Sequence, residues 1–182
     1  MVGSIHDISI EDVHASHVLR PGSSAAKHQS GRLSNYTSSI EGQPPDAAYG
    51  LSRVHRVGPN ISLKRVSMAL SGGGEAADVD IVPPHASGSY PPRDLGVRPA
   101  YGMFMRRAEG VTLSDVAITY EGSEGRPAFV LSDVERISFG AGVTAERPKP
   151  PHKKNAAFDI GLRGECEGVS TAGSGLVTKK LA

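Results

Sequence analysis

Large aromatic side chains and cysteines are scarce in this sequence. Tryptophan is absent, aromatic residues make up 5% of the 182 residues, and Cys166 is the one cysteine. A single cysteine excludes an intrachain disulfide and any metal site built from several cysteines. So few aromatic residues argue against a core built on large aromatic anchors. A chain of this length usually forms one domain, so residues 1–182 are treated as a single domain.

The sequence also lacks an excess of charge and a long apolar run. Its 20 basic and 19 acidic residues leave a formal net charge of +1, which gives no reason to expect nucleic acid or an anionic membrane as a partner. Apolar runs such as 128–131 are far too short to span a bilayer. The first residues lack the basic start and apolar segment of a signal peptide, and the sequence by itself leaves the localisation unknown.

One short pattern occurs four times. It consists of a β-branched apolar residue, then Ser or Thr, then Ile, Leu or Phe, and in three copies a Val follows three positions later. This alternation puts two apolar side chains on one face of a strand and a hydroxyl on the other, and the polar positions before the Val indicate a strand that bends and starts again. The copies are ISIEDV at 8–13, ISLKRV at 61–66, VTLSDV at 111–116 and ISFGAG at 137–142.

The spacing of the four copies predicts the fold. Their starts are separated by 53, 50 and 26 residues, close to two, two and one units of roughly 25, and a period in this range is typical of solenoids. Because no long segment shows helical periodicity, we expect an all-β fold, a right-handed parallel β-helix of about six to seven short turns. An antiparallel β-sandwich is the alternative, but no Asn-Gly or Asp-Gly hairpin signal occurs.

The β-helix prediction specifies which residues stack. One interior column should contain the first residues of the four copies, and a neighbouring column should contain their third residues. The predicted columns are Ile8, Ile61, Val111 and Ile137, and Ile10, Leu63, Leu113 and Phe139.

Three segments between the patterned strands read as long loops. Residues 16–50 are expected to hide one weakly patterned turn. Residues 71–102 are dense in Gly, Pro and Ser, and a loop of that length is usually functional or disordered. Residues 146–155 are basic and rich in Pro, and we expect a solvated loop there.

The best local carboxylate pair is Asp78 and Asp80. In an extended strand, residues i and i+2 lie on one face about 6.5–7 Å apart, near the low end of the separation that an inverting glycosidase needs. His85 follows closely in the sequence. These three residues are weak catalytic candidates, because a hydrated loop before two prolines would have the same sequence.

Tyr and Arg residues gather in the same part of the chain. Tyrosine faces stack on sugar rings, and the arginine fork binds uronate carboxylates through two parallel hydrogen bonds. Surface ion pairs and loop packing would explain the same residues more simply. No metal site or cofactor motif is predicted. The candidate substrate-binding residues are Tyr90, Arg93, Arg98, Tyr101, Arg106 and Arg107.

Residues 90–139 resemble the C-terminal turns of bacterial polygalacturonase-like proteins of glycoside hydrolase family 28. The resemblance is weaker over 1–89 and fades after about residue 145. It implies a right-handed parallel β-helix that cleaves pectin-type polygalacturonides with inversion, and a secreted or periplasmic protein. The elements that carry it are a Gly-rich stretch at Gly72–Gly74, Tyr90–Pro91, a Pro-Ala-Tyr-Gly strand start at Pro99–Gly102 and an Arg-Pro-Ala strand start at Arg126–Ala128.

The catalytic pattern of that family does not carry over to this chain. The sequence contains no Asn-Thr-Asp, no Asp-Asp and no His-Gly, and the family order places these elements upstream of turns like the present ones. The sequence therefore looks like a C-terminal portion of such an enzyme. Three functions stay open: a carbohydrate-active enzyme that works through other residues, a non-catalytic glycan-binding or structural β-helix, and one chain of a split hydrolase.

The N-terminal end of the predicted β-helix suggests a second partner besides a polysaccharide. An uncapped end presents unpaired backbone groups and an apolar cross-section, and only a few residues precede Ile5 and Ile8. We therefore expect a homodimer, most simply a two-fold pair that meets through this end.

Overall fold

The computed structural model describes residues 7–18, 60–83 and 97–182. In this part of the chain, eight strands form one parallel sheet, and a short 3-10 helix is the only helix. The all-β class and the parallel strand direction agree with the sequence prediction, and the antiparallel alternative is excluded for the described strands. No described helix is long and apolar enough to cross a membrane.

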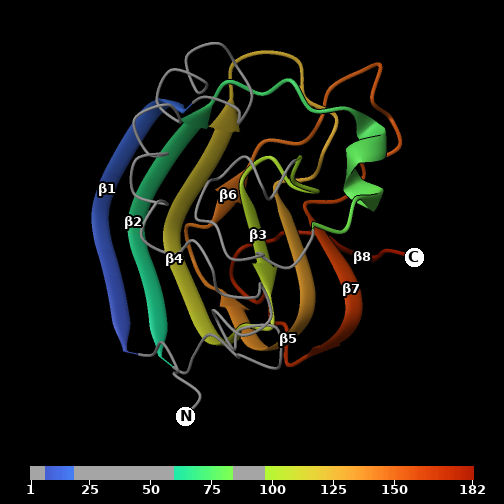
Figure 1. Ribbon diagram of the computed structural model, residues 1–182. Helices are drawn as coiled ribbons and strands as arrows, with labels where there is room; N and C mark the ends of the chain where they lie inside the picture. The colour runs from blue at the N-terminus through green and yellow to red at the C-terminus, as the bar shows by residue number, and fades with distance from the viewer. Residues whose placement is uncertain (1–6, 19–59, 84–96) are drawn as a thin grey trace, which may run out of the picture.

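The sheet has the order β1-β2-β4-β5-β7-β8, with β3 paired to β5 and β6 paired to β4. Figure 1 shows β1, β2 and β4 lying side by side as long curved strands. The 3-10 helix η3 spans Ala76–Asp80. The strands are β1 (Ile8–Val18), β2 (Ile61–Leu70), β3 (Met103–Arg106), β4 (Glu109–Tyr120), β5 (Phe129–Phe139), β6 (Thr144–Ala145), β7 (Ile160–Glu167) and β8 (Thr178–Lys180).

The strand register confirms the predicted stacking of the four sequence copies. In the first column, Ile8 pairs with Ile61, Ile61 with Val111, and Val111 with Ile137. The third residues of the copies stack in the same order, from Ile10 through Leu63 and Leu113 to Phe139. Each copy is therefore one layer of the sheet, and equivalent side chains lie on one another at the strand spacing.

The predicted unit of about 25 residues is wrong for the first two intervals. Because β1 pairs directly with β2, and β2 with β4, the separations of 53 and 50 residues are single steps across this sheet. Only the interval between β4 and β5 is short. The turn expected within 16–50 falls mostly outside the described residues.

The predicted bend within each copy is also confirmed. At its fifth position the backbone turns left-handed, with φ of 56° at Asp12, 52° at Arg65 and 51° at Asp115. A left-handed residue with a side chain costs roughly 1–2 kcal/mol, so stacking of the layers must hold these residues in place. The β5 copy has one extra residue before its Val and uses Gly142 (φ 72°) at the equivalent place.

Two further columns of left-handed residues mark other bends. The register places each member next to its equivalent in the neighbouring layer. The first column consists of Asp7, Asn60, Gly110, Arg136 and Gly168, and the second of Arg107, Asp133 and Gly164. The chain therefore changes direction at the same places in successive layers.

Burial falls steeply toward β1. Leu113 and Phe139 are completely buried, whereas Ile10 in the same column is 42% exposed. Val13 is 39% exposed, whereas Val66 and Val116, which occupy the same position in the next two strands, are buried. The predicted columns exist, but among the described residues they are not interior at β1, because that strand is the last in the sheet order.

A second apolar cluster lies on the outer side of β3 and β5. Val79 from η3 packs there with Ala100 and Val130, and the partly buried Phe104 and Leu181 complete the cluster. The segment 146–155 contacts η3 through Asn155. Asn155 is buried and donates hydrogen bonds to Ala76 O (2.9 Å) and Gly125 O (2.7 Å), so the expectation of a solvated loop is wrong at this residue.

Candidate functional site

The predicted carboxylate pair does not have the predicted geometry. Asp78 and Asp80 lie in η3, and in a 3-10 helix of three residues per turn side chains two apart point in different directions. Asp78 accepts the Glu75 backbone N–H at 2.8 Å, and Asp80 forms an ion pair with Lys154 at 2.7 Å. Both carboxylates therefore have structural partners, and His85 lies outside the described residues.

Tyr101 cannot offer its ring to a sugar. It is 4% exposed, packs edge-to-face against Tyr120 with ring centroids 5.3 Å apart, and donates its hydroxyl to Glu146 O at 2.6 Å. Burial raises its pKa, so it is a neutral core residue. Its burial therefore gives the predicted binding role of Tyr101 no support, whereas Tyr90 and Arg93 lie outside the described residues.

Arg106 ends β3 on the outer side of the sheet. Its guanidinium lies 5.3 Å from the centroid of the Phe104 ring, and its Nη1 donates to Pro83 O at 2.8 Å. Burial and the charge of Arg107 lower the pKa of Arg106, and Asp133 opposes this effect. Arg107 itself occupies one of the left-handed positions, with φ of 53°.

Arg98 precedes β3 in the chain. Burial, and then the charge of Arg106, lower the pKa of Arg98. Within the described part of the chain, the buried Nη1 of Arg98 has no hydrogen-bond partner. The charge of Arg106 acts on Arg98, and the charge of Arg107 acts on Arg106; we call these three predicted binding residues the arginine cluster.

Arg163 is a neighbour of this cluster that sequence reasoning missed. Arg106 pairs in register with Ser132, and Ser132 with Arg163. The guanidinium of Arg163 donates to Val79 O (2.7 Å) and Ile81 O (3.0 Å), so it clamps the segment after η3 onto the sheet. A sequence signal for Arg163 was available. Arg163 follows Ile160 at the same distance as Ser132 follows Phe129, and these two strands pair in register.

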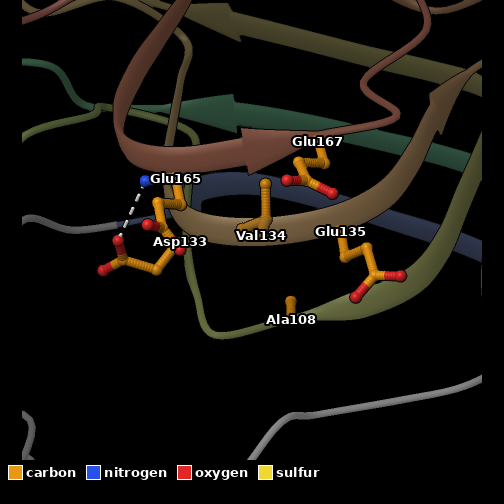
Figure 2. A pocket seen from close by; sticks show the side chains of 6 residues that line it. All are labelled: Ala108, Asp133, Val134, Glu135, Glu165 and Glu167. Carbon is orange, nitrogen blue, oxygen red and sulfur yellow. Dashed lines mark hydrogen bonds between the residues drawn. The ribbon is translucent and has the colours of Figure 1, made fainter.

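An acidic hollow lies beside the column of bends at Arg107, Asp133 and Gly164. Its volume is about 130 Å³. Figure 2 shows Asp133 and Glu165 on one side of Val134 and Glu135 and Glu167 on the other, with Ala108 completing the lining. The hollow arises from register, because Glu109, Glu135 and Glu167 occupy equivalent positions in three layers.

Part of this acidity is neutralised. Arg136 forms ion pairs with both Glu109 and Glu135. Asp133 accepts the Glu165 backbone N–H at 3.2 Å and the Ser132 hydroxyl at 3.1 Å. Among the described residues, no three His, Cys, Asp or Glu side chains are placed to hold a metal ion.

Residues that carried the family resemblance form a buried structural network. Glu124 accepts from Arg126 Nε at 2.8 Å and Nη2 at 2.7 Å, and both side chains are almost completely buried. Arg126 Nη1 also donates to the carbonyls of Arg98 (3.2 Å) and Ala100 (3.4 Å). Gly74 is required here, because a Cβ at that position would lie 1.9 Å from Arg126 Nε.

The family resemblance would also imply an Arg-x-Lys segment among the catalytic elements. Arg147-Pro148-Lys149 has this form, although it follows the turns that carry the resemblance. Arg147 forms an ion pair with the buried Asp159 at 2.7 Å, and Lys149 pairs with Glu146 at 2.5 Å. Both basic residues are thus engaged by acidic neighbours.

Comparison with protein-family models, with curated proteins and with solved structures finds no match for this chain. The resemblance to glycoside hydrolase family 28 therefore stays an interpretation of short sequence motifs.

Proposed function

We propose that this chain is a right-handed parallel β-helix that binds acidic polysaccharides of the polygalacturonide type. The fold proposal is supported by direct parallel pairing of the repeated pattern and by the three columns of left-handed residues. A chain that bends at equivalent places in every layer while pairing in parallel winds around a common axis.

The arginine cluster carries the binding proposal. Arg98 and Arg106 are both partly buried and repel each other, and Arg98 retains a buried donor without a partner in the described part of the chain. Partly buried cations in this arrangement favour an anionic ligand, because its charge offsets both burial and repulsion. Planar carboxylates fit the guanidinium fork, and a polyuronide presents one on each sugar.

Affinity electrophoresis tests the proposal. The protein should be retarded by polygalacturonate and much less by a neutral glucan at equal polymer concentration. Arg98→Ala and Arg106→Ala should each weaken the retardation, on the order of tenfold in Kd for a charge-assisted pair, and more strongly at low salt.

Arg65→Ala is the matched control, because it removes the same charge from an exposed residue of β2 that pairs with Glu11 and Asp12. Its retardation should stay close to that of the original chain. Equal loss in all three variants would show a non-specific charge effect, and equal retention on both polymers would contradict a preference for acidic glycans.

Hydrolysis of the bound polymer is a second candidate function. The observation that favours it is the acidic hollow next to the arginine cluster, since Asp133 lines the hollow and its charge also acts on Arg106. Glycoside hydrolysis requires two carboxyl groups around the scissile bond. A reducing-end assay on polygalacturonate should then detect activity that Glu135→Gln and Glu167→Gln reduce without loss of polymer binding. Activity that is unchanged in both variants, or absent throughout, contradicts this function.

A further inference from the structure

We propose that Ser123 and His152 form a nucleophile and base pair that reacts with an activated carboxylic ester. Ser123 Oγ lies 3.2 Å from His152 Nε2, within the range at which an imidazole takes the proton of a serine hydroxyl. Ser123 is exposed and His152 is half-buried, so a substrate can reach the hydroxyl oxygen. This inference does not depend on the glycan-binding function, because neither residue belongs to the arginine cluster or lines the acidic hollow.

The backbone holds Ser123 between two stacked segments. Strands β2 and β4 pair in register up to their last residues, and the segments that follow them leave the sheet at the same edge (Figure 1). The Ser123 carbonyl accepts the Gly73 backbone N–H at 2.5 Å, and the next residue, Glu124, is buried in its ion pair with Arg126. Ser123 therefore lies on a fixed backbone, and its hydroxyl needs little ordering to meet the imidazole.

His152 is held by the segment 146–155. Its carbonyl accepts from the Asn155 backbone N–H at 3.3 Å. The Asn155 side chain donates to Gly125 O at 2.7 Å, so this segment is tied to the loop that carries Ser123. Gly125 is required at the contact, because a Cβ there would lie 2.9 Å from His152 Nδ1. The two reacting side chains thus come from two loops that are bonded to each other.

The reaction follows from this geometry. In the tautomer with its proton on Nδ1, His152 accepts the Ser123 proton at Nε2 while Oγ attacks the ester carbonyl carbon and forms the new bond. The ester C–O bond breaks, and the imidazolium gives its proton to the leaving oxygen, which releases the alcohol. Water then attacks the acyl-serine and passes a proton through Nε2 back to Oγ, so that the acid is released and the pair is regenerated.

The surroundings of His152 favour a substrate with a good leaving group. Among the described residues, no side chain accepts a hydrogen bond from Nδ1 of this imidazole, whereas a full triad has a carboxylate at that place. A pair without this group stabilises the imidazolium less, and an amine leaves only when it is protonated at the same time. The substrate class is therefore an ester rather than an amide.

Covalent labelling tests the inference. The original chain and His152→Gln are treated with an alkyl fluorophosphonate, in which the serine oxygen bonds to phosphorus, fluoride leaves and the imidazole takes the proton. Peptide mass spectrometry measures the label at each serine. We expect Ser123 to react well above the rate of the exposed Ser170, whose oxygen accepts the Ala172 backbone N–H at 3.4 Å. In His152→Gln the rate at Ser123 should fall on the order of 100-fold.

Ester hydrolysis provides the second readout. The original chain should release nitrophenolate from para-nitrophenyl acetate with an initial burst, and Ser123→Ala should abolish this release. The matched control is His14→Gln, which removes an exposed imidazole from β1 and should behave as the original chain does. Circular dichroism checks that each variant is folded, and the comparison of Ser123 with Ser170 within the original chain needs no variant.

Three results would overturn the inference. The first is equal labelling of Ser123 and Ser170 in the original chain, which would make Ser123 an ordinary surface hydroxyl. The second is equal labelling of Ser123 in the original chain and in folded His152→Gln, because the imidazole would then not act as a base. The third is labelling of Ser123 without any nitrophenolate release that depends on Ser123, because the proposed pair must accept an acyl group from an ester.

Discussion

Arg126 Nη2 lies 2.7 Å from Glu124 Oε2, and the two side chains are 8% and 0% exposed. Glu124 also accepts a hydrogen bond from the Gly74 backbone N–H, and Arg126 also donates to the carbonyls of residues 98 and 100. The ion pair therefore links these segments of the described structure. Breaking a buried pair by removing one partner leaves an uncompensated charge, which costs roughly 3–5 kcal/mol.

The first prediction is that acid destabilises the protein through Glu124. Burial alone would raise the pKa of Glu124, but the hydrogen bonds and charge of Arg126 outweigh it, and the pKa lies below its ordinary value of 4.5. A carboxyl whose pKa is lowered by folding stabilises the folded state above its unfolded pKa, and this contribution is lost as the pH falls through the folded value. Urea unfolding should therefore show a fall in stability below about pH 4.5.

The Glu124→Gln variant isolates this contribution. It should be less stable at pH 7 by roughly 3–5 kcal/mol, because Arg126 loses its buried counter-charge, and its stability should depend less on pH in the acid range. Glu165→Gln, at an exposed position of β7, serves as the control. An acid profile of Glu124→Gln that matches the original chain would assign the effect to other carboxyls.

The second prediction concerns Gly74, which lies against the same pair. A Cβ there would lie 1.9 Å from Arg126 Nε and 2.5 Å from Glu124 Oε1, so Gly74→Ala should destabilise the protein by several kcal/mol, on the order of a broken buried pair. At Gly161 the added methyl meets the end of the flexible Leu181 side chain at 2.6 Å, and Gly161→Ala should cost less. Thermal unfolding of the two variants compares them, and equal losses would contradict the role assigned to Gly74.

The third prediction uses the gradient of burial along one column. Leu113→Ala removes a completely buried side chain and should cost about 2–5 kcal/mol. Ile10 occupies the same column but is 42% exposed, so Ile10→Ala should cost less than about 1 kcal/mol. Chemical unfolding measures both values. Similar losses would mean that Ile10 is covered in solution.

The fourth prediction is self-association through β1. Within the described residues β1 ends the sheet and exposes Ile10 and Val13, and an edge strand with apolar side chains favours pairing with another chain. We propose a two-fold homodimer at this edge. Ile10→Lys should shift the protein from dimer to monomer in light scattering with its circular dichroism retained. A stable monomer of the original chain at high concentration would refute this proposal.

The sequence by itself determined the register of four strands, β1, β2, β4 and β5. The repeated pattern that begins at Ile8, Ile61, Val111 and Ile137 is a local signal, because alternation and a bend position are properties of a few consecutive residues. The same signal identified the bends at Asp12, Arg65 and Asp115. It could not show that 53 residues separate directly paired strands, because the length of chain between two strands does not reveal whether another strand lies between them.

Only the tertiary structure decided which side chains come together. Arg106 lies two strands from Arg163 because the register stacks 106, 132 and 163, and the acidic hollow arises from the stacking of Glu135 and Glu167. Tyr101 was a reasonable sugar-binding candidate by residue type, yet the chain direction at the start of β3 places it in the core. Contacts between layers depend on where each bend falls in three dimensions, and residue type and spacing along the chain do not contain that information.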